Sequence, residues 1–227
     1  MTATRIFLVR HGSTELSAED AFAGETDVAL SDVGRAQLEK LAVRLSGEPI
    51  AAFYASPLGR TMETARILAA PHGKPVTAKE GLREISHGHW EGKTRAMVER
   101  DFPMEYARWE GDPYSFAPPG GETGLAVTAR ALPALLEIVG AHPGELVLAA
   151  SHKATIRLLV ASLLGFDLRR YRDFLDQSPA SLNILDFKGV SNARLTLFND
   201  TSHYAASPSA TAAIASGRLS SVWAGKP

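Results

Sequence analysis

The sequence predicts an α/β fold in which helices cover both faces of a central sheet. Apolar runs typical of short strands alternate with helical patterns along most of the 227-residue chain. The strand-like runs are residues 5–9, 50–55, 145–150, 181–187 and 194–198. Because strands that alternate with helices form βαβ units, this order favours a sheet between two helical layers.

The helices of this pattern are bounded by capping and helix-stopping residues. Ser31 is expected to cap the first helix, which ends at Gly47. The other three helices are expected over residues 60–70, 122–139 and 154–164. Glycine or proline follows each of them, as is usual at helix ends.

Residues 93–121 interrupt this alternation. The stretch is rich in aromatic residues and ends in Pro118-Pro119-Gly120-Gly121. It is expected to form a short helical insertion and a rigid loop that act as a lid or specificity element. The alternative is a surface excursion whose aromatic side chains simply pack on the domain.

The chain divides into one domain over residues 1–204 and an Ala/Ser-rich tail over residues 205–227.

The composition indicates an ordinary globular protein, with 45% hydrophobic and 22% charged residues. The net charge of −1 and the lack of a basic block argue against nucleic-acid binding. No apolar run approaches the length of about 18 residues that spans a membrane, and no apolar leader precedes the first strand. We therefore expect no membrane partner and a cytoplasmic location. The absence of cysteine excludes disulfides, thiolate metal sites and a cysteine nucleophile.

The end of the first strand carries the most informative motif of the chain. Arg10, His11 and Gly12 directly follow the apolar residues 6–9. Ligands of open α/β sheets bind at the carboxyl ends of strands, so a site is expected here. Arginine offers a fixed fork of donors to a phosphate or carboxylate, and histidine serves as a base or nucleophile near neutral pH. Gly12 would let the backbone approach a ligand closely.

Three further strand ends deliver residues of matching chemistry. The apolar run 146–150 ends at Ser151-His152, and the run 50–54 is followed by Arg60 near the start of the next helix. Free N–H groups and the helix dipole favour an anion at that position. Glu84 precedes a glycine-rich loop over residues 88–92. Two histidines, two arginines and one glutamate suit phosphoryl transfer to a histidine.

In this order, the motifs resemble the histidine phosphatase (phosphoglycerate-mutase-like) superfamily, over roughly residues 5–204. The residues that carry the resemblance are Arg10-His11-Gly12-Ser13-Thr14, Ser56-Pro57 with Arg60, Glu84 with Gly88 and Glu91-Gly92, and Ser151-His152. The resemblance implies a three-layer α/β/α fold with a mixed, mostly parallel central sheet. Residues 1–204 would then form the catalytic domain, with the insertion 93–121 as its lid.

The resemblance implies a phosphatase that needs no metal and no cofactor. His11 is interpreted as the nucleophile, which attacks phosphorus through Nε2 and forms a phosphohistidine. Arg10 and Arg60 would hold the non-bridging oxygens of the phosphate, and His152 would donate a further hydrogen bond. The substrate would be a small phosphorylated metabolite, and a homodimer is left open.

Glu84 is interpreted as the general acid for the leaving oxygen and then as the base for the attacking water. Glu15 and Glu91 are the competing choices. Glu91 lies in a Trp-Glu-Gly turn, which favours a structural role, and Glu15 follows the nucleophile motif too closely to reach the leaving group easily.

Two positions depart from the family pattern. Ser17 stands where many members carry an asparagine, and its hydroxyl can still donate one hydrogen bond to phosphate. Lys153 follows His152 where the family usually has glycine. A cation in the first turn of a helix opposes the helix dipole, and a bound anion would offset that cost. Lys153 is therefore expected to contact the substrate, or else to extend its ammonium into solvent.

Three other functions are weighed against a phosphatase. A phosphoglycerate mutase-type enzyme would pass the phosphoryl group to a second hydroxyl instead of water. The motif His87-x-His89 raises a metal hydrolase, for which no third ligand is evident nearby. A non-catalytic binding module is the third. The stretches 82–92 and 118–122 resemble alpha-ribazole phosphatases and metal-independent phosphoserine phosphatases, which favours the phosphatase.

Overall fold

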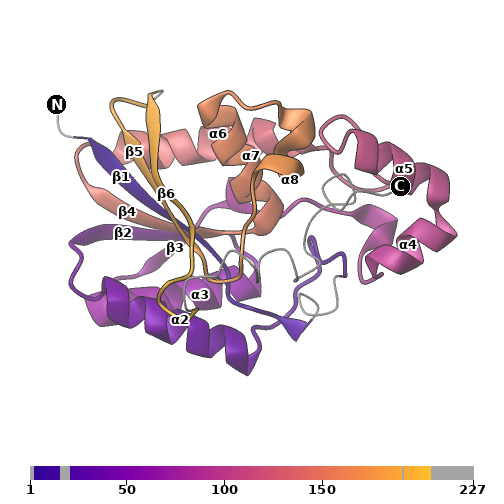
Figure 1. The fold of residues 1–227 in the computed structure, drawn as a ribbon. Helices are drawn as coiled ribbons and strands as arrows, with labels where there is room; N and C mark the ends of the chain where they lie inside the picture. Colours follow the sequence, from indigo (N-terminus) through magenta and orange to yellow (C-terminus); the bar gives the residue numbers. More distant parts are fainter. Residues whose placement is uncertain (1–2, 16–20, 191, 206–227) are drawn as a thin grey trace.

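The computed structural model describes residues 3–15, 21–190 and 192–205 and has three layers (Figure 1). The strands are β1 (Thr4–Arg10), β2 (Ile50–Ala55), β3 (Val76–Ala78), β4 (Leu146–Ser151), β5 (Leu182–Phe187) and β6 (Ala193–Asp200). They form one sheet in the order β3-β2-β4-β1-β5-β6. Strands β3, β2, β4 and β1 are parallel, and β5 and β6 are antiparallel to their neighbours. The expected mixed, mostly parallel sheet is confirmed.

The register of the sheet brings two of the predicted site residues together. Strands β1 and β4 are parallel neighbours, with Arg10 paired to Ser151. The pairing continues one residue further, since the His11 N–H donates to the Ser151 carbonyl at 3.0 Å. His11 and His152 therefore leave the sheet at the same level.

Strand β3 was not predicted from the sequence. It is three residues long and pairs only with β2, at the edge of the sheet. Its side chains are partly or fully exposed, so an apolar run, the signal used for the other strands, is absent.

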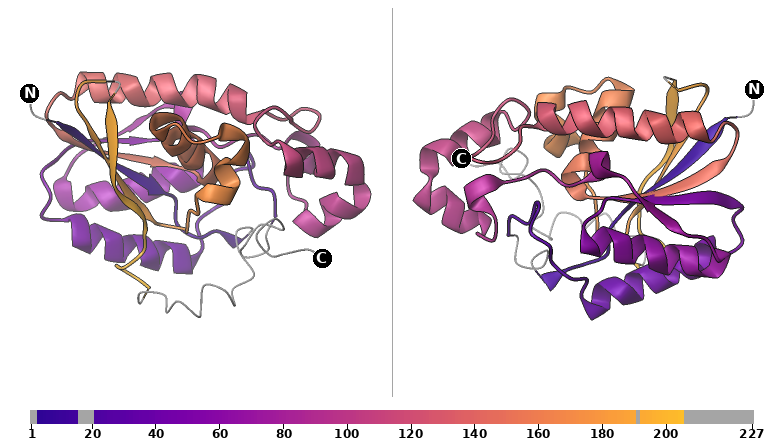
Figure 2. Two further views of the ribbon diagram at one scale, coloured as in Figure 1. Left: turned by 45° about the horizontal axis from the view of Figure 1, so that its top comes forward. Right: turned by 180° about the vertical axis from the view of Figure 1, so that it is seen from behind.

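Helices cover both faces of the sheet, as expected (Figures 1 and 2). On one face lie α2 (Asp32–Leu45) and α3 (Gly59–Ala69), and on the other α6 (Gly124–Ala141) and α7 (Lys153–Leu164). Strand β1 is buried between these layers. Its residues Ile6 and Leu8 join the core under α6 and α7, whereas Phe7 and Val9 join the core against α2. This alternation follows from the two-residue period of a strand.

The helix ends agree with the capping residues. The Ser31 hydroxyl accepts a hydrogen bond from the Gly34 N–H at 3.1 Å, so the predicted cap of α2 is confirmed. Helix α3 continues as a 3₁₀ turn, η1 (Ala70–His72), and ends at Gly73 with a φ of 62°. Such a left-handed conformation favours glycine.

Helix α6 is long and apolar enough to cross a membrane, judged by length and composition alone. Core helices of globular proteins also meet that test. The buried side chains of α6 include Val127, Ala131, Leu135 and Ile138, which recur at helical spacing and belong to the same core as Ile6 and Leu8. The apolar character of α6 is therefore explained by its packing in the domain.

The insertion forms two helices, α4 (Arg95–Asp101) and α5 (Pro103–Gly111), at one end of the molecule (Figure 1). Its Trp109 packs in a small apolar cluster with Phe22, Trp90 and Val98. The remaining elements are short and were not predicted. They are η2 (Glu80–Leu82), η3 (Gly88–Trp90), η4 (Leu168–Arg170) and α8 (Tyr171–Phe174).

Candidate active site

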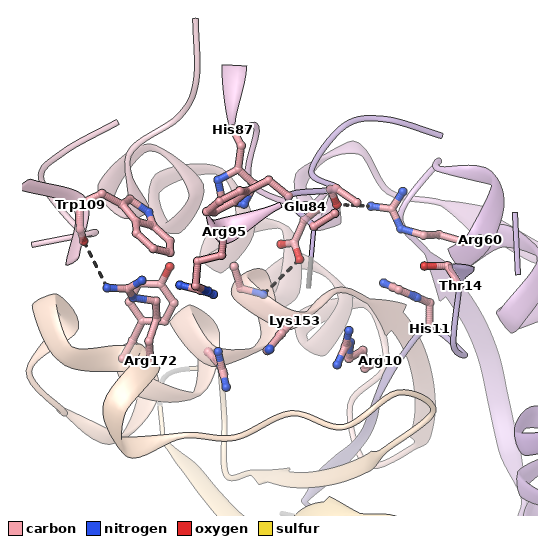
Figure 3. A pocket seen from close by; sticks show the side chains of 16 residues that line it. Arg10, His11, Thr14, Arg60, Glu84, His87, Arg95, Trp109, Lys153 and Arg172 are labelled. Atoms are coloured by element: carbon pink, nitrogen blue, oxygen red, sulfur yellow. Dashed lines mark hydrogen bonds between the residues drawn. The ribbon is translucent and has the colours of Figure 1, made fainter. Parts of the chain in front are cut away.

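A cavity of about 150 Å³ lies where β1 ends, between the sheet and the insertion (Figure 3). It is smaller than the roughly 300–1,000 Å³ of pockets for drug-sized ligands, so it suits a small metabolite. Most of its charged lining residues are cations. The titratable residues of the lining are Arg10, His11, Arg60, Glu84, His87, Arg95, Lys153, Arg157, Tyr171 and Arg172. Glu84 is the one carboxylate among the lining residues.

The buried ring of His11 is oriented by its neighbour. Nδ1 of His11 lies 2.8 Å from the Gly12 carbonyl oxygen. A carbonyl only accepts hydrogen bonds, so Nδ1 carries the proton and Nε2 keeps its lone pair. Burial, together with the positive charges of Arg10 and Arg60, holds the pKa of His11 well below its usual value. The ring is therefore a neutral imidazole at pH 7.

Arg10 and Arg60 are both buried beside His11. Nη1 of Arg10 donates to the Gln177 carbonyl at 2.5 Å, and its Nε is buried with no hydrogen-bond partner in the part of the chain that the structure describes. Burial lowers the pKa of Arg10 to about 10, which leaves it charged at pH 7. Arg60 is held by carbonyl oxygens of one loop, donating to Thr26 at 2.8 Å and to Gly24 at 2.6 Å. The fold thus fixes two guanidinium groups around the nucleophile candidate.

Glu91, one of the competing choices for the acid, organises that loop instead of lining the cavity. Its carboxylate accepts hydrogen bonds from the Gly24 N–H at 2.9 Å, the Thr26 hydroxyl at 2.7 Å and the His87 N–H at 2.8 Å. The other choice, Glu15, is exposed and does not line the cavity either.

Glu84 is buried, and its carboxylate contacts the first turn of α7. Its Oε1 accepts hydrogen bonds from the N–H groups of Ile85 at 3.0 Å and Thr155 at 3.1 Å. The Thr155 hydroxyl lies 3.1 Å from the same oxygen and donates its proton to the Arg83 carbonyl at 2.6 Å. Its Oε2 accepts one, from the Ala154 N–H at 3.1 Å. Oε2 is therefore the oxygen with room to carry a proton.

His152 is fully buried and does not line the cavity. Its ring packs edge-on against that of His11, with centroids 5.2 Å apart. Nε2 lies 2.7 Å from the Ser56 hydroxyl oxygen, and Nδ1 is buried without a partner. Burial and the charge of Arg60 hold the pKa of His152 well below its usual value.

The three remaining predicted residues have different outcomes. A Cβ on Gly12 would come within 2.7 Å of the Gly34 carbonyl, so close packing against the start of α2 requires glycine here. Gly12 does not line the cavity. Ser17 lies outside the described residues. Lys153 is partly buried and directs its ammonium into the cavity (Figure 3), the placement expected of a substrate contact.

Sequence reasoning missed the cations that α4, α7 and α8 contribute. These are Arg95, Arg157 and Arg172. Arg157 follows Lys153 by one helical turn, so helical spacing could have found it. Arg172 gave no such signal, because it reaches the cavity through a contact distant in the sequence. Its guanidinium lies 3.7 Å from the Trp109 ring centroid, and its Nη2 donates to the Trp109 carbonyl at 3.2 Å.

The two histidines that raised a metal site serve other contacts. His87 packs edge-on against Phe22, with centroids 4.8 Å apart. His89 stacks on Phe102, and its Nε2 lies 2.8 Å from a Glu105 oxygen. Within residues 3–15, 21–190 and 192–205, no group of three or more His, Asp or Glu side chains is placed to hold a metal ion.

A neutral imidazole between two buried guanidinium groups and beside a carboxylate defines a site for phosphoryl chemistry on an α/β scaffold. The comparisons with known proteins agree. The family model of the histidine phosphatase superfamily (branch 1) matches residues 6–201. The chain belongs to this superfamily and is a phosphoric monoester hydrolase.

Two curated relatives are phosphatases. The chain is 32% identical to phosphoserine phosphatase 1 of Hydrogenobacter thermophilus, over 88% of this chain and 93% of the relative. It is 34% identical to glucosyl-3-phosphoglycerate phosphatase of Mycolicibacterium vanbaalenii, over 73% and 76%. Among solved structures, Bacillus stearothermophilus YhfR has a TM-score of 0.83 and 33% identity, over 88% of this chain and 99% of that chain.

Proposed function

We propose that the protein hydrolyses small phosphomonoesters without a metal, through a phosphohistidine on His11. The observation that carries the proposal is the contact of His11 Nδ1 with the Gly12 carbonyl, which leaves Nε2 as the nucleophile. The low pKa of His11 supports it, because only the neutral ring can attack phosphorus. Arg10 and Arg60 supply positive charge where the transferred group carries negative charge.

In the first step, Nε2 of His11 attacks phosphorus, a P–N bond forms, and the bond to the ester oxygen breaks. Glu84 gives the proton on Oε2 to that oxygen, so the alcohol leaves neutral. In the second step, water attacks phosphorus while Glu84 takes one of its protons. The P–N bond then breaks, inorganic phosphate leaves and the imidazole is restored. Removal of Glu84 should therefore slow both steps.

His152 supports the phosphoryl group in this scheme. The scheme uses the tautomer in which Nε2 accepts from the Ser56 hydroxyl and Nδ1 carries the proton, and Nδ1 has no partner in the described part of the chain. That N–H is the donor proposed for a phosphoryl oxygen once substrate binding opens the cavity to the ring, which is fully buried and outside the lining in this structure. The low pKa of His152 makes it a neutral donor rather than an imidazolium at pH 7.

The relatives support a small substrate. Their names specify phosphoserine and glucosyl-3-phosphoglycerate, which are both phosphomonoesters of small molecules. A mutase of the phosphoglycerate type would share the first step and differ only in the acceptor of the second. The cytoplasmic location, the homodimer and the role of residues 93–121 as a lid stay predictions.

Rapid trapping tests the proposal. The protein is mixed for milliseconds with a phosphomonoester carrying labelled phosphate, quenched with alkali and digested. Acid-labile label on His11 is expected, with phosphate and alcohol released in equal amounts and with no effect of a strong chelator. Label on a serine or aspartate would contradict the nucleophile. Transfer of label to an added alcohol instead of water would indicate a mutase, and loss of activity with chelator would indicate a metal enzyme.

A further inference from the structure

Cations line the end of the cavity away from His11, which we call the distal end. Arg95 lies on this side, and the inference concerns the other three cations, Lys153, Arg157 and Arg172. In Figure 3, Lys153 lies between Arg10 and Arg172, and Arg172 is on the side opposite His11. Lys153 and Arg157 are four residues apart on α7 and so share one face of that helix. Arg172 comes from α8.

These cations have fewer anionic partners than their number requires. Arg157 donates to Asp176 at 3.1 Å, and Arg172 donates to Glu110 at 3.3 Å. Glu110 also accepts from Arg95 at 3.5 Å. Lys153 has no hydrogen bond or ion pair with any side chain in the described part of the chain.

The unsatisfied donors extend beyond Lys153. The Nε atoms of Arg157 and Arg172 are both buried and have no hydrogen-bond partner among the described residues, and Arg157 is only 9% exposed. Buried N–H donors without partners are rare in folded proteins, because each loses its bond to water and gains nothing in return. The cavity lining thus contains one ammonium without a side-chain partner and two guanidinium groups, each with a buried Nε donor that has no partner in the described chain.

The proximity of these buried cations destabilises the folded protein when no anion is bound. Burial and the charges of Arg157 and Arg10 lower the pKa of Lys153 to about 7. Like charges one helical turn apart repel each other. An anion bound at the distal end would offset this repulsion and supply an acceptor for the Lys153 ammonium. Strained or poorly satisfied groups of this kind concentrate at functional sites.

The phosphoryl group does not need these cations. Arg10 and Arg60 line the cavity, and their guanidinium charges act on His11, so positive charge is already present at the nucleophile. The distal end therefore faces the remainder of the substrate.

We infer that the preferred substrates carry a second anionic group, a carboxylate or a second phosphate, bound by Lys153, Arg157 and Arg172. This inference rests on the proposed phosphatase activity, since it assigns the other end of the same substrate. It selects against neutral alcohol phosphates, which would leave the buried cations without an anion.

Three substrates with the same three-carbon chain test the inference. They are 3-phosphooxypropanoate, propane-1,3-diol bisphosphate and propyl phosphate, which differ only at the end remote from the transferred group. For the wild-type protein, kcat/KM is expected to be about 10- to 100-fold higher for an anionic substrate than for propyl phosphate, the worth of a charged hydrogen bond. The ranking of the two anionic substrates identifies the second group as carboxylate or phosphate.

Variants locate the effect. Lys153→Met and Arg172→Met should each reduce the ratio of anionic to neutral kcat/KM to a third or less. Lys40→Met and Arg169→Met are the matched controls, because both side chains are exposed, and they should keep the wild-type ratio. Arg172 also anchors the Trp109 carbonyl, so circular dichroism must show that its variant is folded. Lys153→Met makes no such anchor and carries the test alone if Arg172→Met unfolds.

Binding provides a readout that does not need turnover. Calorimetry should give a Kd about tenfold lower for 3-phosphonopropionate than for propylphosphonate, and Lys153→Met should remove that difference. Equal kcat/KM for all three esters, with hydrolysis intact, would overturn the distal site and leave the phosphatase proposal standing. No hydrolysis of any ester, with the difference in binding retained, would overturn the phosphatase proposal instead.

Discussion

The two ends of the cavity are held in place by different kinds of structure. At the chemical end, His11 and His152 follow two strands whose backbone ladder continues into the site. At the distal end, Arg172 stands on the four-residue helix α8 and lies against Trp109 of the insertion. The proposed reaction thus depends on residues that the sheet positions, whereas the proposed selection of the substrate depends on side-chain packing between helices. Substitutions should separate these two properties.

Removal of the nucleophile should have the largest effect and break the chemical end alone. We expect His11→Ala to lower kcat on the order of 10⁶-fold, as for other nucleophiles that form covalent intermediates. Steady-state phosphate release measures the loss. The distal end should be unaffected, so the variant should still bind 3-phosphonopropionate more tightly than propylphosphonate. A residual kcat within a hundredfold of wild type would mean that another group attacks phosphorus.

Glu84→Gln should cost about 10²–10⁴-fold in kcat for alkyl phosphates, the usual worth of general acid–base catalysis. The loss should be much smaller for nitrophenyl phosphate, whose leaving group needs no proton. Glu15→Gln is the matched control, because Glu15 is exposed and does not line the cavity, and it should retain wild-type rates. An equal loss for good and poor leaving groups would argue against Glu84 as the acid.

The pKa of His11 tests the electrostatic environment of the chemical end. Burial and two neighbouring arginines lower its pKa, so its Hε1 resonance should titrate with a midpoint well below pH 6.5. Arg60→Gln should raise this midpoint, because it removes one of the two positive charges. Proton NMR of wild type and variant measures both values. A midpoint at or above 6.5 in the wild type would contradict the neutral nucleophile.

The smallest effect is expected on stability, at the distal end. Lys153→Met should raise the melting temperature at pH 7 by a few degrees, since about 1 kcal/mol corresponds to roughly 2–4 °C in a chain of this size. The folded pKa of about 7 lies below the unfolded value, so the wild-type protein gains stability as pH rises from 7 towards 10. The advantage of the variant should therefore shrink over that interval.

Scanning calorimetry at several pH values measures this trend. Lys40→Met, on the exposed side of α2, should leave the melting temperature unchanged at every pH. A lower melting temperature for Lys153→Met at pH 7 would show that the lysine stabilises the empty protein, against the electrostatic argument.

The chemical end could be predicted because it depends on local patterns. An apolar run that ends in a polar motif marks the end of a buried strand, and the ends of parallel strands meet at one edge of a sheet. Arg10, His11 and His152 were located in this way. Glu84 was found from its motif, but its hydrogen bonds to Ala154 and Thr155 have no local signal.

The distal end could not be predicted in the same way. An arginine on a helix usually extends into solvent, and nothing near Arg172 in the sequence shows that it lies against Trp109. Gly12 is a second case in which contacts distant in the sequence limit the prediction. Its lack of a side chain was interpreted as room for a ligand, whereas the neighbour that requires glycine is Gly34, on a helix further along the chain.

The first turn of α7 has a consequence for how this enzyme could be redesigned. Its three consecutive residues have different contacts, since Lys153 lines the cavity while Ala154 and Thr155 bind the carboxylate of Glu84. Insertions or backbone shifts in this turn, made to change the substrate range, would also displace Glu84, the proposed proton donor. Arg95 and Trp109 of the insertion α4–α5 line the cavity. Within the described chain, the insertion forms no hydrogen bond with Glu84. Substitutions that aim to change specificity in laboratory evolution are therefore best placed in that insertion.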